Sequence, residues 1–175
     1  MKLKTRDIVY IGFIAALCAV ATTIRIEIPG GAMVHLGSAA LFTTSILFGG
    51  LYGGLGAAIG SALFDLFGGH TQYIVFSFFI KGIAGLIVGG MTAGYLPPSI
   101  TKPTASFTRI LVALIIGAIW TAFGYFIAWW FVLNSAAVAA SKIQYSLITS
   151  AAGIIVAIVL TPKLQKIVRR LFTKN

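Results

Sequence analysis

Charged residues are too scarce in this chain to cover the surface of a water-soluble domain. They make up 9% of the 175 residues, and hydrophobic residues make up 59%. A soluble domain carries about 25% charged residues. The composition therefore excludes a soluble enzyme and a disordered chain, and it predicts an integral membrane protein.

The apolar residues fall into runs that resemble membrane-spanning helices, each of which needs about 20 mostly apolar residues. Polar, glycine-rich or proline-rich stretches separate these runs, and residues 134–141 are expected to form a loop of small residues. The predicted spans are 8–24, 36–48, 51–67, 72–94, 108–133 and 143–160, followed by a basic tail at 161–175. The sequence thus predicts a single transmembrane domain over residues 1–175, an all-α protein with six helices in a compact bundle.

Lys and Arg residues are concentrated on one predicted side of the membrane. Of the 13 Lys and Arg residues, ten fall on the side of the N-terminus, whereas only Arg25 and Lys142 fall on the other. Because cytoplasmic loops carry the excess of Lys and Arg, both termini are expected to be cytoplasmic. Topology and contact with anionic lipid account for the net charge of +10 without a nucleic-acid partner.

Groups suited to catalysis are few. The chain has no Gly-Lys-Ser/Thr phosphate-binding motif, one cysteine (Cys18) and three acidic residues. We therefore expect no enzymatic activity, no metal site and no cofactor of its own.

Lys81 is the most informative single residue because it lies inside a predicted span. A charge at that depth is costly and normally faces a cavity or a partner. Asp65 lies near the outer end of the preceding span. Two interpretations stay open: a structural pair between Lys81 and Asp65, or a ligand site in which Lys81 meets the ligand and Asp65 tunes it.

Aromatic and polar residues gather toward the predicted outer half of the bundle. An interfacial belt of Trp and Tyr would occur at both membrane surfaces, so the bias toward one side favours a pocket with aromatic walls. Trp129 lies on the same helix face as Tyr125 and Thr121. The candidate substrate-binding residues are His35, Asp65, Gln72, Tyr73, Lys81, Tyr125, Trp129, Asn134, Gln144 and Tyr145.

Small residues recur every three or four positions along the first span. They are Gly12, Ala15, Ala16 and Ala19. Such spacing lets helix backbones approach closely. The face is therefore suited either to packing inside the bundle or to contact with another membrane protein.

Four short motifs resemble those of a known family. They are MVHLG at 33–37, LFGGLYG at 47–53, ALFDL at 62–66 and FIKG at 79–82. With six short spans and an Ala-rich first helix, the chain resembles the substrate-binding S component of an energy-coupling factor (ECF) vitamin transporter. The similar branch includes proteins assigned to hydroxymethylpyrimidine or pyridoxine.

The resemblance implies a function and a set of partners. An S component binds its vitamin with high affinity at the outer face of the bacterial plasma membrane. It works with a T-type membrane protein and two ATPase subunits, which hydrolyse the ATP. The family's Ala-x-x-x-Ala coupling motif matches Ala15 and Ala19, so these residues, with Gly12 and Ala16, are expected to face the membrane partner.

The identity of the vitamin stays open at this point. Aromatic walls suit a heteroaromatic ring such as hydroxymethylpyrimidine or pyridoxine, whereas Lys81 would suit an acidic vitamin such as pantothenate. We favour the ring because aromatic residues outnumber the single buried charge. A small secondary transporter or channel is the alternative from another class, but a lone Lys81 and the lack of a visible repeat argue against it.

Overall fold

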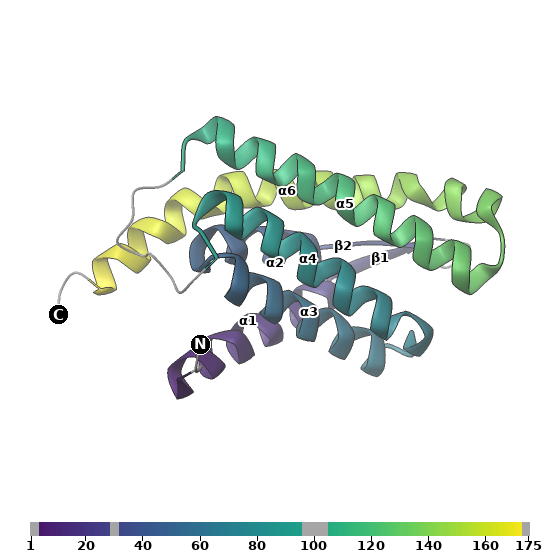
Figure 1. Ribbon diagram of the computed structural model, residues 1–175, viewed down its shortest axis with the longest axis horizontal. Helices are drawn as coiled ribbons and strands as arrows, with labels where there is room; N and C mark the ends of the chain where they lie inside the picture. The colour runs from purple at the N-terminus through teal and green to yellow at the C-terminus, as the bar shows by residue number, and fades with distance from the viewer. Residues whose placement is uncertain (1–3, 29–31, 96–104, 173–175) are drawn as a thin grey trace.

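The chain folds into a bundle of helices with a small hairpin near its middle (Figure 1). The computed structural model describes residues 4–28, 32–95 and 105–172. The helices of these segments are α1 (Thr5–Thr23), α2 (Gly37–Phe48), α3 (Gly50–Phe67), η1 (Thr71–Tyr73), α4 (Ile74–Thr92), α5 (Phe107–Leu133) and α6 (Ala136–Phe172). The strands are β1 (Arg25–Ile28) and β2 (Ala32–His35).

The mostly helical fold agrees with the prediction from composition. In the described segments, five helices are long and apolar enough to cross a membrane, and α2 is a shorter apolar helix. With 12 residues, α2 is about 18 Å long at 1.5 Å per residue, which is less than the ~30 Å hydrocarbon core. The number of crossings and the orientation of the termini therefore stay predictions.

The connection after α1 is a β-hairpin, which the all-α prediction did not include. The strands β1 and β2 pair antiparallel, with Arg25 opposite His35 and Ile28 opposite Ala32. Isoleucine at alternate positions of β1 favours an extended strand. The proline and glycines that marked this segment as a loop lie between the strands, at 29–31, outside the described residues.

The predicted loop over residues 134–141 is wrong. Asn134 ends α5 in the left-handed conformation, with φ of 51°. The chain turns there and α6 begins at Ala136. Alanine has the highest helix propensity, so the small residues after Ser135 extend the helix. At its other end α6 continues through Pro162 to Phe172, so most of the predicted tail is helical.

Glycines bring α3 and α4 into direct backbone contact. A β-carbon on Gly85 would approach the Gly54 α-carbon to 2.6 Å, and one on Gly89 would collide with Gly50. Only glycine allows helix axes to come this close. These glycines therefore pack inside the bundle at this interface.

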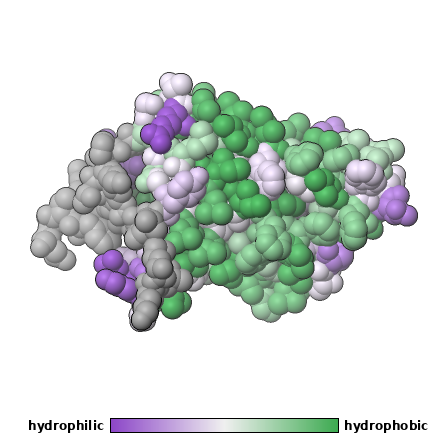
Figure 2. Space-filling view, in the orientation of Figure 1, coloured by the Kyte–Doolittle hydropathy of each residue, from purple (hydrophilic) through white to green (hydrophobic). Residues whose placement is uncertain are grey.

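The helix bundle has two opposite ends, which differ in the chain segments that lie there. Both termini lie at one end, and the turns that join α3 to α4 and α5 to α6 lie at the other (Figure 1). Between the ends, hydrophobic residues cover the middle of the visible face (Figure 2). The exposed hydrophobic residues of α5 include Ile119, Phe123 and Phe131, which are 54% to 78% exposed. A surface of this kind is suited to contact with lipid.

Candidate functional site

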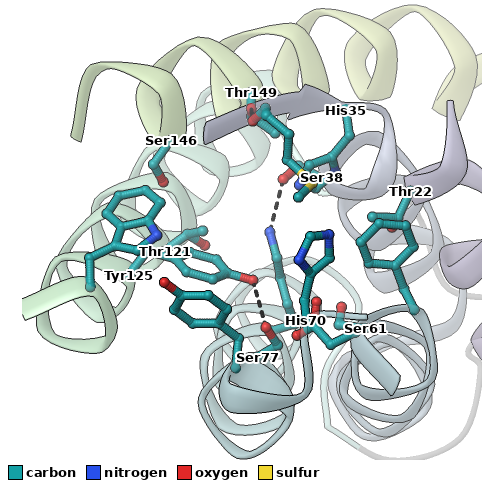
Figure 3. Close-up of a pocket in the computed structure, with 16 residues that line it drawn as sticks. Thr22, His35, Ser38, Ser61, His70, Ser77, Thr121, Tyr125, Ser146 and Thr149 are labelled. Atoms are coloured by element: carbon teal, nitrogen blue, oxygen red, sulfur yellow. Dashed lines mark hydrogen bonds between the residues drawn. The ribbon is translucent and has the colours of Figure 1, made fainter. Parts of the chain in front are cut away.

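A pocket lies toward the end of the bundle at which α3 joins α4 and α5 joins α6 (Figure 1), and Figure 3 shows the side chains that line it. It lies where α1 and α3 end, where α4 and α6 begin, and beside the second half of α5. The lining residues are Thr22, Met33, His35, Ser38, Ser61, Phe64, Asp65, His70, Tyr73, Ser77, Lys81, Thr121, Tyr125, Trp129, Ser146 and Thr149. Two charged side chains, aromatic rings and many hydroxyl groups thus share one cavity.

Lys81 is enclosed in this pocket and is only 4% exposed. Its Nζ donates a hydrogen bond to Ser38 Oγ at 3.1 Å. The same Nζ lies 5.3 Å from the centre of the Tyr125 ring, within range of a cation–π interaction. In the part of the chain that the structure describes, the ion pair within 4.0 Å joins Arg25 to Glu27, not Lys81 to Asp65. No direct contact between Lys81 and Asp65 therefore supports the interpretation of Lys81 as part of a structural pair.

Asp65 and His70 bring unpaired polar atoms to the same pocket. Asp65 is 7% exposed, and its Oδ2 atom is buried without a hydrogen-bond partner. His70 Nε2 is likewise buried and unpaired. Buried polar atoms in proteins nearly always have partners, because an unmade hydrogen bond costs about 1–3 kcal/mol. These atoms are suited to receive polar groups of a ligand.

The aromatic wall comes from one face of α5. Thr121, Tyr125 and Trp129 follow one another at intervals of four residues and all line the pocket. The Tyr125 and Trp129 rings are 5.6 Å apart between centroids. A hydrogen bond of 3.1 Å joins the hydroxyl groups of Tyr125 and Ser77 and so fixes the Tyr125 ring against α4. The two rings are tilted by 31° relative to each other, and they offer an aromatic surface next to polar groups.

His35 reaches the pocket from β2 as a neutral imidazole. Burial, together with the nearby charges of Lys81 and Arg25, lowers the pKa of His35 to about 3. Its Nδ1 accepts a hydrogen bond of 3.1 Å from the Gly37 backbone N–H. A neutral ring that accepts at Nδ1 carries its proton on Nε2. His35 therefore has a donor left over for a further partner.

The hairpin is attached to the helices around the pocket. The guanidinium of Arg25 lies 5.1 Å from the centre of the Phe64 ring on α3. On the opposite side, the Thr149 hydroxyl donates to the Met33 carbonyl oxygen at 3.4 Å. The hairpin thus spans from α3 to α6 at the pocket.

With this geometry in view, the chain can be compared with known proteins. A family model for the S component of ECF-type riboflavin transporters matches residues 2–166. The chain belongs to this family. The predicted resemblance to ECF S components is confirmed, and the family is one of transporter subunits rather than enzymes.

Two individual proteins are similar to this chain. An uncharacterized protein in a gap 3' region of Pyrococcus woesei is 29% identical over 142 residues, which are 81% of this chain and 88% of that protein. The solved structure of the S component of a bacterial ECF transporter has a TM-score of 0.72 and 19% identity. It covers 95% of this chain and 99% of its own. At that identity, the likeness shows a shared fold.

The S component brings together six of the ten residues predicted to bind substrate. They are His35, Asp65, Tyr73, Lys81, Tyr125 and Trp129. The other four do not line the pocket: Gln72, Asn134 and Gln144 are exposed, and Tyr145 is half-buried. Asn134 forms the end of α5, and Gln144 Nε2 donates to the Ser141 carbonyl oxygen at 3.1 Å.

Hydroxyl side chains are the part of the pocket that sequence reasoning missed. Apart from Thr121, the Ser and Thr residues were not singled out because they are common in membrane helices, where they bond their own backbone. Their positions held a usable signal, since Ser146 and Thr149 lie three residues apart on α6 and share a face. Ser38 also directly follows Gly37, the last residue of the motif at 33–37.

The predicted partner-facing surface on α1 needs one correction. Ala15 is 3% exposed, and a β-carbon on Gly60 of α3 would collide with its carbonyl oxygen. Ala15 therefore packs inside the bundle, because the small residues of α1 and α3 let these helices cross closely. Ala19 is half-buried, whereas Gly12 and Ala16 are exposed. The outward small residues of α1 are thus Gly12 and Ala16.

Proposed function

We propose that this S component captures a vitamin or vitamin precursor that contains a heteroaromatic ring, at the outer face of a bacterial plasma membrane. In this proposal it delivers the ligand to an ECF transporter, in which a T-type membrane protein and two ATPase subunits drive import with ATP. The S component itself needs no cofactor. Hydroxymethylpyrimidine and pyridoxine are the leading candidates for the ligand.

The observation that supports this function best is the aromatic wall beside Lys81. Tyr125 and Trp129 offer the stacking surface, and the Lys81 ammonium lies over the Tyr125 ring. Stacking of aromatic rings adds about 0.5–1.5 kcal/mol beyond the burial of apolar area. A flat ring with polar substituents can use both the wall and the hydroxyl groups around it.

Co-purification tests the proposed function directly. The S component would be purified in mild detergent, denatured, and its small molecules identified by mass spectrometry. Thermal-shift screening would then rank riboflavin, hydroxymethylpyrimidine, pyridoxine and pantothenate. A stoichiometric heteroaromatic vitamin supports the proposal. Pantothenate as the ligand would retain vitamin capture and overturn the heteroaromatic assignment, and binding of no vitamin would overturn capture itself.

Replacing Trp129 by Ala should weaken vitamin binding at least tenfold. The change removes both stacking and buried apolar area, and 1.4 kcal/mol corresponds to a factor of ten. Trp130 is the matched control because it follows directly on α5, is 52% exposed and does not line the pocket. Isothermal titration of both variants would check this, and equal losses in the two would contradict the role of Trp129.

The proposed outer position of the pocket predicts a pattern of chemical labelling. A cysteine in place of Ala137, at the exposed start of α6, should react with an impermeant thiol reagent on intact cells. A cysteine in place of Lys163 should react only after the cells are opened. Cys18 is 2% exposed and gives a low background. The reverse pattern would place the pocket on the cytoplasmic side.

A further inference from the structure

The pocket holds two opposite charges that do not touch each other. The Lys81 ammonium has three N–H donors, one of which binds Ser38. Asp65 Oδ2 has no partner, although the Asp65 side chain is buried. Both charged groups of the pocket thus keep hydrogen-bonding capacity that the protein itself does not use.

The charges of Lys81 and Asp65 cancel each other, which limits the charge of a ligand. These two are the Lys, Arg, Asp and Glu side chains among the described lining residues, and of the two lining histidines, His35 and His70, His35 is neutral. Burying an additional, uncompensated charge in a poorly solvated site is costly. A carboxylate beside Lys81 would leave Asp65 as a second anion in the cavity. An ammonium beside Asp65 would leave Lys81 as a second cation.

We propose that the pocket selects ligands without net charge that present a hydrogen-bond acceptor to Lys81 and a donor to Asp65, with their ring against Tyr125 and Trp129. This inference rests on the proposed function, because it takes the pocket as the vitamin site. Ring nitrogens and carbonyl groups supply the acceptor, and hydroxymethyl, amino or ring N–H groups supply the donor. Simple carboxylate vitamins are disfavoured, even though the cavity contains a lysine.

Matched ligand pairs test this selection on the purified full chain in nanodiscs of zwitterionic lipid. The probes are pyridoxine with 4-pyridoxic acid, nicotinamide with nicotinate, and hydroxymethylpyrimidine with its 5-carboxylate analogue. Within each pair the ring is kept, and a hydroxymethyl or amide group is replaced by a carboxylate, which adds a negative charge and removes a hydrogen-bond donor. Isothermal titration should give at least tenfold tighter binding for the uncharged member of every pair that binds.

Asp65→Asn should reverse this preference. The uncharged ligand should bind at least tenfold more weakly, because a hydrogen bond to a charged group is lost. The carboxylate analogue should bind more tightly, because the charge of Lys81 is no longer balanced. Glu27→Gln is the matched control: it makes the same change of charge in the hairpin beside the pocket but outside its lining. This variant should keep the wild-type preference.

Lys81→Met gives a second test if Asp65→Asn does not fold. With only Asp65 charged, the pocket should favour pyridoxamine, which carries an ammonium group, over pyridoxine. A wild-type preference for the carboxylate members, or variants that leave every preference unchanged, would overturn the charge selection and leave vitamin capture standing. Failure to bind any probe, riboflavin and pantothenate included, would instead overturn the proposed function.

Discussion

Replacing both Gly12 and Ala16 by Leu should abolish vitamin uptake while leaving vitamin binding intact. Both residues are exposed on α1, and a β-carbon on Gly12 would meet nothing within 4 Å. The S component itself therefore has room for larger side chains there. A partner helix that crosses α1 closely at these small residues leaves no room for the larger side chains of Leu.

Uptake by cells that contain the whole transporter, and titration of the purified S component, would measure the two effects separately. Ala151→Leu, at an exposed position of α6, is the control for added bulk on the membrane-facing surface. Ala15→Leu should behave differently and impair folding, because Ala15 packs against Gly60. Normal uptake in the Gly12 and Ala16 double variant would show that the partner binds another face.

Replacing Lys81 by Met should weaken vitamin binding by about 1.5–3 kcal/mol, the usual value of a hydrogen bond to a charged group. Met keeps the length of the side chain and removes its charge. The fold should be retained, because the ammonium contacts the Ser38 hydroxyl and the face of the Tyr125 ring and forms no ion pair within the described residues. Titration and thermal unfolding of the same sample would check both statements.

A double variant separates a binding role of Lys81 from a structural one. If Lys81 served only to balance Asp65, the change of Lys81 to Met together with Asp65 to Asn would restore stability and affinity. We expect weak binding to persist in this double variant, because both polar contacts to the ligand are then lost. Full vitamin affinity in the double variant would show that Lys81 does not contribute to binding the vitamin.

Much of the helical architecture could be predicted because it follows from apolar runs and glycine breaks. The hairpin could not, because the four residues of each strand are too short for a clear periodic pattern and pair with each other rather than with a larger sheet. The start of α6 was missed because small residues between two spans suggest a loop. Alanine continues a helix unless a residue such as Asn134 stops it.

Site residues could be predicted from the sequence where a side chain is energetically unfavourable in an apolar, membrane-spanning helix. Lys81 and Asp65 were found because a charge in an apolar run demands compensation. Gln72, Asn134 and Gln144 were expected in the pocket because they are polar and near the outer end of the spans. Polarity alone does not settle which way a side chain points, and at a helix end water satisfies these groups equally well.

The glycine contact between α3 and α4 has a consequence for how such a protein can change its ligand. Asp65 lies on α3 and Lys81 on α4, and these helices touch through Gly54 and Gly85 with no side chains between them. The separation of the two backbones that carry these charged residues is therefore set by main-chain packing, and side-chain rotamers adjust only the positions of the charged groups themselves. Substitutions of the hydroxyl and aromatic side chains around this pair can therefore change the ligand specificity one residue at a time, while the packing of α3 against α4 stays the same.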